Sequence, residues 1–233
     1  MQRKAIVIGA TGLVGQHLVK QLSELYDTLI VIARRPPRYI NVSMRFYQVN
    51  DFDNLAEIFS SVGVDKKTDA FSCLGTTKKQ AGSSEAFRKI DHDYNVNFAK
   101  LCQDKGVENF FLLSSMNADI NSRFLYKRVK AETEQSIMAL DFAQIVIFRP
   151  SLLLGKHKGR PLESMGQKAF KLISPLVSES MPLHPISAKR VASAMAMSAH
   201  DIYERSKYRS EPRTNTTRII ENKQMLSMTR VKQ

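Results

Sequence analysis

Residues Gly9-Ala10-Thr11-Gly12-Leu13-Val14-Gly15 directly follow an apolar run at 5–8 and precede a helical pattern. Glycines at this spacing permit a tight turn and let the backbone approach a pyrophosphate, while the helix offers its N-terminal N–H groups to the anion. The first gap between glycines is one residue wider than in GxGxxG. Because a strand precedes the motif and a helix follows it, the sequence favours a dinucleotide-binding turn over an ordinary strand-to-helix turn.

A second apolar run, at 28–33, ends in Arg34-Arg35-Pro36-Pro37. Units of this kind that bind NAD usually place an acidic residue here for the ribose 2′-hydroxyl, and this strand end has none. Two guanidinium groups suit a 2′-phosphate, because they form bidentate, charge-assisted hydrogen bonds with it. The sequence therefore favours NADP(H) over NAD(H), with Arg34 the stronger candidate; solvated loop arginines are the alternative.

Strand and helix patterns alternate along the rest of the chain, as in proteins with a parallel sheet. Further strands are predicted at 46–49, 70–74, 110–113, 144–148 and 218–220, and helices at 55–59, 84–104, 125–140, 162–176 and from Ser187. This predicts an α/β fold, a doubly wound parallel sheet (Rossmann fold), with ligands at the carboxyl ends of its strands. We expect a single NAD(P)-binding domain over 1–233, in which 155–233 contribute a small C-terminal, substrate-side appendage.

The substrate side is the least informative part of the sequence. It offers the basic cluster at 156–160, the predicted helix at 162–176 and His184, for which a simple loop role is the alternative. The helix from Ser187 carries apolar residues that suit the core or a subunit contact: Val191, Ala192, Ala194, Met195 and Met197. So short a segment favours a small carbonyl pocket over an elaborate sugar-nucleotide site.

Composition narrows the class of protein. The formal charge is +13, yet the basic residues are spread along the chain and no nucleic-acid module is visible, so we expect no specific nucleic-acid partner. The N-terminus leads straight into the first strand and no apolar run approaches about 20 residues, which predicts a cytoplasmic protein without a membrane span. Cys73 and Cys102 lie in apolar surroundings and are expected to be buried, with neither a disulfide nor a metal site.

Tyr126 and Lys130 are the candidate catalytic pair. At i, i+4 spacing both side chains project from one face of the predicted helix, so the ammonium can act on the phenol. A nearby cation favours the ionised phenol and brings it toward use in proton transfer. Ser114 and Ser115 end the preceding strand, where a hydroxyl can bond a substrate oxygen. Structural roles, an aromatic packed in the core and a solvated lysine, are the alternatives for the pair.

These motifs together resemble the short-chain dehydrogenase/reductase superfamily, and more narrowly its atypical branch with the Tat-interacting oxidoreductase-like proteins and their bacterial relatives. The stretches that carry the resemblance run in family order over most of the chain: GATGLVG at 9–15, CLGTTKKQAG at 73–82, LLSSMNAD at 112–119, FLYKRVKAE at 124–132 and FRPSLLLG at 148–155. The segment at 73–77 stands where most members of the superfamily carry Asn-Asn-Ala-Gly.

The resemblance assigns roles by position. The residues expected to bind the cofactor are Gly9, Thr11, Gly12, Leu13, Val14, Gly15, Arg34, Arg35, Asp51, Phe52, Leu74, Gly75, Thr76, Lys130, Pro150, Ser151 and Leu152. Among them the resemblance implies residues 51–52 for the adenine, residues 74–76 for the adenosine ribose, and the backbone at 150–152 for the nicotinamide carboxamide. Tyr126 and Lys130 match the catalytic pair, and Lys130 would also hold the nicotinamide ribose.

The catalytic serine stays open between two residues. Ser115 is the first choice, although it stands 11 positions before Tyr126, closer than is common in the superfamily; Ser114 is the alternative.

Two functions agree with the sequence. The first is an NADP(H)-dependent oxidoreductase that moves hydride between nicotinamide and a small carbonyl or alcohol, with Tyr126 as proton donor or acceptor. The second is an NADPH-binding regulatory protein, a sensor that acts through a protein partner. A homodimer is also compatible with the sequence, and the substrate is not identified.

Overall fold

The computed structural model of the protein describes residues 2–155, 183–208 and 215–230. Its centre is a seven-stranded sheet in which every neighbouring pair of strands is parallel. In spatial order the strands are β3 (Met44–Gln48), β2 (Thr28–Ala33), β1 (Lys4–Ile8), β4 (Thr68–Ser72), β5 (Asn109–Leu113), β6 (Gln144–Arg149) and β9 (Thr216–Glu221). The order reverses direction at β1, so the predicted doubly wound parallel sheet is confirmed.

The central strands are buried on both faces, which explains their nearly continuous apolar sequences. In β1, Ala5 and Val7 pack into one hydrophobic cluster, whereas Ile6 and Ile8 pack into the other. Successive side chains of a strand point to opposite faces. The sheet therefore divides the core into two layers.

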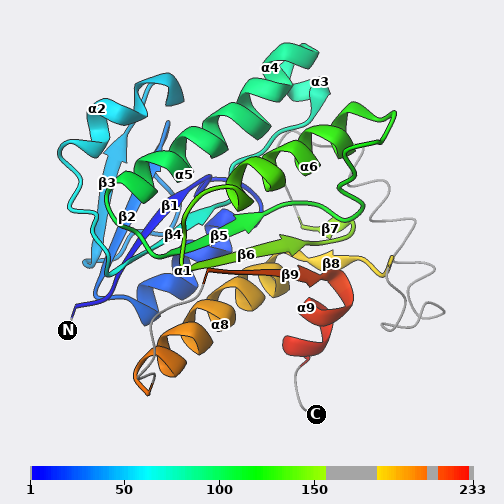
Figure 1. Ribbon diagram of the computed structural model, residues 1–233. Helices are drawn as coiled ribbons and strands as arrows, with labels where there is room; N and C mark the ends of the chain where they lie inside the picture. Colours follow the sequence, from blue (N-terminus) through cyan, green and yellow to red (C-terminus); the bar gives the residue numbers. More distant parts are fainter. Residues whose placement is uncertain (1, 156–182, 209–214, 231–233) are drawn as a thin grey trace.

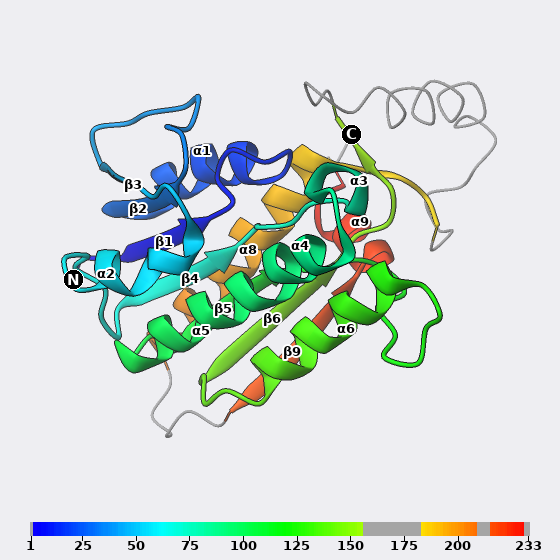
Figure 2. The same ribbon diagram turned by 90° about the horizontal axis from the view of Figure 1, so that it is seen from above.

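Helices cover both faces (Figure 1). The first cluster is closed by α1 (Gly15–Leu25), α8 (Ala188–Ser206) and α9 (Asn222–Met228). The second is closed by α2 (Leu55–Phe59), α5 (Tyr94–Asp104) and α6 (Leu125–Met138), and Figure 2 shows α5 and α6 running side by side over the sheet. The short 3-10 helix η1 (Phe52–Asn54) leads into α2.

The predicted helix at 84–104 is interrupted. It consists of α4 (Ser84–Arg88), the π-helical turn η2 (Lys89–Asp93) and α5, after the short helix α3 (Lys78–Ala81). A π turn contains one residue more than an α turn and is common at functional sites. Here it packs against α6, and its Asp91 accepts the backbone N–H of Thr76 in the segment after β4.

The C-terminal residues contribute to the main sheet through β9 and to a separate two-stranded sheet. Two short strands, β7 (Leu153–Leu154) and β8 (Ile186–Ser187), pair in parallel as a separate small sheet. Ser187 caps α8, as its hydroxyl accepts the N–H of Arg190 at 3.2 Å. The predicted helix at 162–176 and the basic cluster at 156–160 lie outside the described residues.

The apolar residues of α8 behave largely as expected. Val191, Ala192, Ala194 and Met195 are fully buried against the sheet, and Met197 is 46% exposed. In the part of the chain that the structure describes, α8 and the other helices are too short or too polar to cross a membrane.

Both cysteines are buried and unpaired, as predicted. Burial raises the pKa of the Cys73 thiol to about 12 and that of Cys102 well above its ordinary value. Their neutral thiols serve as small core side chains.

Candidate functional site

The glycine turn joins β1 to α1 with very little space. Gly9 has a φ of +76°, and a Cβ on it would lie 2.3 Å from the carbonyl carbon of Cys73. A Cβ on Gly15 would lie 2.1 Å from the oxygen of Gly9, which already accepts the N–H of Gly12 at 3.0 Å. Only glycine fits at these two positions.

The glycine turn fits a dinucleotide. Thr11 is exposed and Gly12 half-exposed in front of α1, whose first turn has no acidic side chain to repel an anion. Leu13 and Val14 are buried, so any contact they make with a pyrophosphate would come from their backbone. Gly155 packs closely against Leu13: a Cβ added to Gly155 would lie only 2.6 Å from Cδ1 of Leu13.

A cavity of about 110 Å³ lies beside the end of β2. Four of the predicted cofactor residues line it: Arg34, Asp51, Phe52 and Leu74. Asn50, Ile90 and Tyr94 complete the lining and were not predicted. A cavity with one aromatic wall, an aliphatic wall and a guanidinium at its mouth suits an adenosine group. Arg35 is exposed and is not part of this lining.

Tyr94 and Asp51 fix the polar side of this cavity. The Tyr94 hydroxyl donates to Asp51 Oδ1 at 2.6 Å, and the rings of Tyr94 and Phe52 lie 5.5 Å apart. The bond from Tyr94 lowers the pKa of Asp51, whereas burial together with Asp51 raises the pKa of Tyr94 to about 12. At neutral pH the pair is a carboxylate and a phenol, and the aromatic wall is held in place.

Tyr126 and Lys130 both lie in the first half of α6, as the spacing predicts, but in different environments. Tyr126 is 42% exposed, with its ring 5.9 Å from that of the buried Phe87. Lys130 is buried, and its Nζ lies 2.8 Å from Oδ1 of Asp91, a fully buried residue of the π turn. Burial alone would lower the pKa of the Lys130 ammonium, but the Asp91 carboxylate and the Tyr126 phenol outweigh it and raise that pKa. Lys130 is therefore a cation at neutral pH.

The segment after β4 passes over this ion pair. Thr76 donates its backbone N–H to Asp91 Oδ2 at 2.7 Å. The exposed Gly75 lies so close that a Cβ on it would be 3.2 Å from Asp91 Oδ1 and 3.4 Å from Lys130 Nζ. The predicted residues Gly75, Thr76 and Lys130 are thus brought together at the carboxyl ends of the strands, with Asp91 as the residue that joins them.

The two candidate serines differ in their contacts. Ser114 is buried, and its hydroxyl donates to Glu134, which also forms a two-point ion pair with Arg149 at 2.5 and 3.0 Å. Ser115 is half-exposed, and its hydroxyl makes a long bond of 3.4 Å to the carbonyl of Met116. Ser114 is occupied in a buried network, and Ser115 has the hydroxyl that is available to a ligand.

The segment 150–152 is anchored from α9. Asn222, at the start of α9, accepts the N–H of Ser151 at 3.1 Å and donates to the carbonyl of His184 at 2.7 Å. The Ser151 hydroxyl donates to that same carbonyl at 2.6 Å, while Leu152 is 46% exposed. The His184 ring lies 2.8 Å from the carbonyl oxygen of Pro185, in the segment just before β8.

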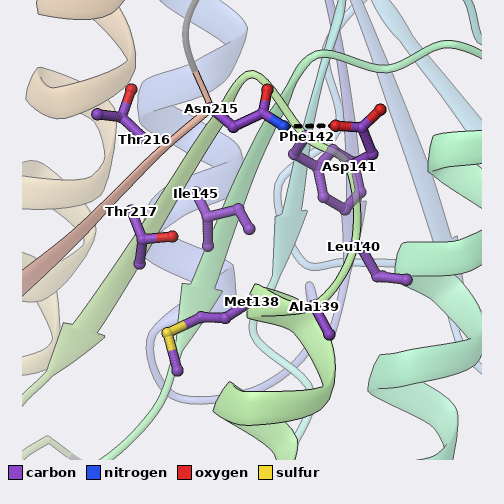
Figure 3. A pocket seen from close by; sticks show the side chains of 9 residues that line it. All are labelled: Met138, Ala139, Leu140, Asp141, Phe142, Ile145, Asn215, Thr216 and Thr217. Atoms are coloured by element: carbon purple, nitrogen blue, oxygen red, sulfur yellow. Dashed lines mark hydrogen bonds between the residues drawn. The ribbon is translucent and has the colours of Figure 1, made fainter.

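A second hollow, of about 290 Å³, lies at the opposite edge of the sheet (Figure 3). It is formed by the loop between α6 and β6 and by the first residues of β9, and Asn215 donates a hydrogen bond to Asp141 at its rim. Ligands of doubly wound sheets bind at the carboxyl ends of strands, so this hollow is remote from the predicted chemistry. Among the described residues, no group of three or more His, Cys, Asp or Glu could hold a metal ion.

Curated relatives cover most of the chain. The mitochondrial protein FMP52 of Meyerozyma guilliermondii is 35% identical over 202 residues, which are 84% of this chain and 85% of the relative. The protein HTATIP2 of Rattus norvegicus is 35% identical over 179 residues, 73% of this chain and 72% of the relative. The expected resemblance to the branch with the Tat-interacting oxidoreductase-like proteins is confirmed.

These relatives contradict the expected cytoplasmic location. FMP52 proteins of Meyerozyma guilliermondii, Candida albicans and Emericella nidulans are all named mitochondrial. The prediction relied on a chain start that leads straight into the first strand and on the absence of a long apolar run, and neither feature identifies the compartment.

Solved structures share the fold of this chain, and a family model indicates the class of cofactor. A short-chain dehydrogenase family protein from Francisella tularensis aligns with a TM-score of 0.67 at 14% identity, over 96% of this chain and 99% of that chain. A UDP-glucose 4-epimerase aligns with a TM-score of 0.67 at 12% identity, over 97% and 80%. The model of the NAD dependent epimerase/dehydratase family matches residues 5–190, and the chain belongs to that family of NAD(P)-binding proteins.

Proposed function

We propose that the protein is an NADP(H)-dependent oxidoreductase of the short-chain dehydrogenase/reductase type that reduces a small carbonyl compound. The observation that carries the proposal is the exposed Tyr126 hydroxyl-bearing ring on α6, one turn before a buried Lys130 that Asp91 keeps charged. Both lie at the edge of the sheet where the glycine turn opens. A phenol one helical turn from a fixed cation can act as the proton donor to a carbonyl oxygen.

In this proposal the predicted cofactor residues share one binding track at the carboxyl ends of the strands. The glycine turn at 9–15 would hold the pyrophosphate, and the cavity beside β2 would hold the adenosine. Gly75 and Thr76 would pass beneath the ribose, and the backbone at 150–152 would meet the carboxamide. When bound, the reduced cofactor supplies the hydride.

The chain's own residues handle the proton and the orientation. Tyr126 would donate its phenolic proton to the carbonyl oxygen of the substrate, and Ser115 would hold that oxygen by a hydrogen bond. Lys130 would contact the nicotinamide ribose and favour the charge that develops on Tyr126. Phe87 packs against the Tyr126 ring and would help to orient its hydroxyl.

A preference for NADP(H) is supported by Arg34. It lines the cavity proposed for the adenosine and follows β2 directly, and no acidic residue neighbours it in the sequence at the strand end. A guanidinium at this place would bind a 2′-phosphate by charge-assisted hydrogen bonds.

A mitochondrial location is proposed on the names of the FMP52 relatives. Cell fractionation with an antibody against the protein would test it, and recovery in the soluble cytosolic fraction alone would contradict it.

The test of the function compares Tyr126→Phe with the unmodified protein. NADPH oxidation is followed by absorbance against a panel of small aldehydes, ketones and quinones. Removal of one hydroxyl should lower turnover by about 10²- to 10⁴-fold and leave NADPH affinity nearly unchanged. Tyr208→Phe, at a tyrosine that is 85% exposed near the end of α8, is the matched control and should behave as the unmodified protein.

Two results would overturn the proposed chemistry. One is an active protein whose Tyr126→Phe variant turns over at the original rate. The other is tight NADPH binding without turnover of any carbonyl, which would favour the alternative function as an NADPH sensor.

A further inference from the structure

Asp91 is a fully buried acidic residue whose contacts all converge on the candidate site. Its Oδ1 lies 2.8 Å from Lys130 Nζ, and its Oδ2 accepts the Thr76 N–H at 2.7 Å. Its backbone carbonyl accepts the Thr133 hydroxyl and the Asn95 side-chain amide, each at 3.0 Å. The π turn, the segment after β4 and α6 are thus all tied together through one residue.

We propose that Asp91 is a positioning residue, which keeps the Lys130 ammonium charged and held against Gly75 for its contact with the nicotinamide ribose. The inference rests on the proposed function, because it takes the ribose contact of Lys130 from there. Asp91 itself touches neither substrate nor cofactor in this scheme; it acts through Lys130 and through the backbone of Thr76.

The surroundings of Lys130 explain why an acid is needed. The groups that face its ammonium are Asp91 from the π turn, Tyr126 and Glu134 from α6, and Cys73 after β4. Glu134 is already paired with Arg149. Cys73 is neutral at physiological pH, because burial raises its pKa to about 12. Asp91 therefore provides the compensating charge for a buried cation that would otherwise lose its proton.

Asp91→Asn isolates this charge. An asparagine has nearly the same shape and can still accept the Thr76 N–H, so the variant removes the charge and keeps that contact. Without the carboxylate, burial lowers the pKa of Lys130. The ammonium should then lose its proton as pH rises through the mildly alkaline range, and with it the ribose contact.

The experiment measures NADPH affinity by fluorescence titration as a function of pH. The unmodified protein should keep its affinity from about pH 7 to about pH 9, well below the ordinary lysine pKa. Asp91→Asn should bind at least about tenfold more weakly at about pH 9 than at about pH 7, as expected when a charged contact is lost. Asp93→Asn is the matched control, since it removes the same charge two positions later, where the side chain is 55% exposed. It should follow the unmodified protein.

A thermal-unfolding cycle covers the case in which Asp91→Asn is too unstable to titrate. If Asp91 compensates Lys130, the double variant Asp91→Asn/Lys130→Met should unfold at a higher temperature than Asp91→Asn alone. Parallel pH profiles for Asp91→Asn and the unmodified protein, or strictly additive shifts in the cycle, would overturn the inference. Absence of turnover with an intact pH effect on NADPH affinity would contradict the proposed enzyme and not the role of Asp91.

Discussion

Asp69 and Asp91 are buried carboxylates with different surroundings. Asp69 lies at the amino end of the parallel strands, and Asp91 lies beside their carboxyl ends. Asp69, near the start of β4, accepts hydrogen bonds from Tyr26, Asn109 and Arg3 at 2.5, 2.6 and 3.2 Å. The Arg3 guanidinium lies between the rings of Tyr26 and Tyr203, at 4.2 and 4.0 Å from their centres. Each oxygen of Asp69 has at least one donor, and aromatic side chains cover its cation.

The partner cation of Asp91, Lys130, is covered in a different way from Arg3. Lys130 Nζ is separated from solvent on one side by the exposed backbone of Gly75 rather than by a side chain. The hydrogen bonds of Asp69 are all made within the protein and are covered by side chains, so they hold secondary-structure elements together. The ion pair of Asp91 and Lys130 is covered by Gly75, which has no side chain, so hydroxyl groups of a ligand can approach it. Burial alone therefore does not identify a functional acid, whereas the groups that cover its partner cation do.

The largest expected loss of stability and of NADPH binding is at the glycine turn, which joins β1 to α1 at the carboxyl end of the sheet. Gly9→Ala would force a side chain into a positive-φ position and against the backbone of Cys73. We expect a loss of about 3 kcal/mol or more in unfolding free energy and no measurable NADPH binding. Chemical denaturation and fluorescence titration measure the two. Gly63→Ala, where nothing lies within 4 Å of the added Cβ, is the control. Equal stability of the two variants would contradict the packing described here.

The next prediction distinguishes the structural role of Asp69 from the role proposed for Asp91. Asp69→Asn should lower the unfolding free energy by about 2 kcal/mol, because an amide nitrogen replaces one of the two oxygens that accept buried hydrogen bonds, and should leave NADPH affinity unchanged. Burial raises the pKa of Asp69 above its ordinary value of 3.8. Its contribution to stability is therefore full below that value and is lost as pH rises through the folded-state pKa.

The stability gap between the unmodified protein and Asp69→Asn should accordingly be widest in acid and narrow as pH rises. Urea denaturation over a pH series measures it. An Asp69→Asn variant that stays folded but binds NADPH weakly would contradict a purely structural role for Asp69.

A smaller effect is expected at the two arginines after β2. Arg34→Ala should weaken NADPH binding by about 1.5 kcal/mol, roughly tenfold, with little change for NADH. Arg35→Ala, the neighbouring control outside the cavity lining, should change NADPH affinity much less. Fluorescence titration with both cofactors decides the matter, and equal affinities of the unmodified protein for NADPH and NADH would contradict the proposed preference.

The smallest effect concerns Cys73, which follows β4 at the carboxyl-end edge itself. Its thiol is buried and has a pKa of about 12, so a thiol reagent should leave it unlabelled in the native protein at neutral pH. Mass spectrometry should find both cysteines labelled only after denaturation. Rapid native labelling of Cys73 would mean that this edge is more open than the structure indicates.

The sequence was informative where a feature depends on neighbouring residues. The glycine turn, the strand end at Arg34 and the i, i+4 pair of Tyr126 and Lys130 are all local, and the structure places each at the expected edge. Their roles toward cofactor and substrate stay predictions. The alternation of apolar runs was sufficient for the fold class, because parallel strands need helical crossovers.

Asp91 and Tyr94 were missed because their roles depend on contacts between distant elements. Asp91 meets Lys130 across 39 positions of sequence, and Tyr94 meets Asp51 across 43. One signal was available: between Phe87 and Phe98, Asp91 and Asn95 occupy the apolar stripe of the predicted helix, where an uncompensated acid would be costly. The π turn itself leaves no comparable trace in the composition.

The π turn also sets the rotational phase of the helix on either side of it. An α-helix advances about 100° per residue, so one additional residue rotates everything before the turn by roughly that angle relative to everything after it. Phe87 can thereby face Tyr126 at the edge while Phe98 packs against Phe59 and Phe110 in the core. Deleting a single residue from 89–93 would restore an unbroken helix and turn one half out of alignment. Chain length at this point is therefore as specific a property of the protein as the identity of any side chain.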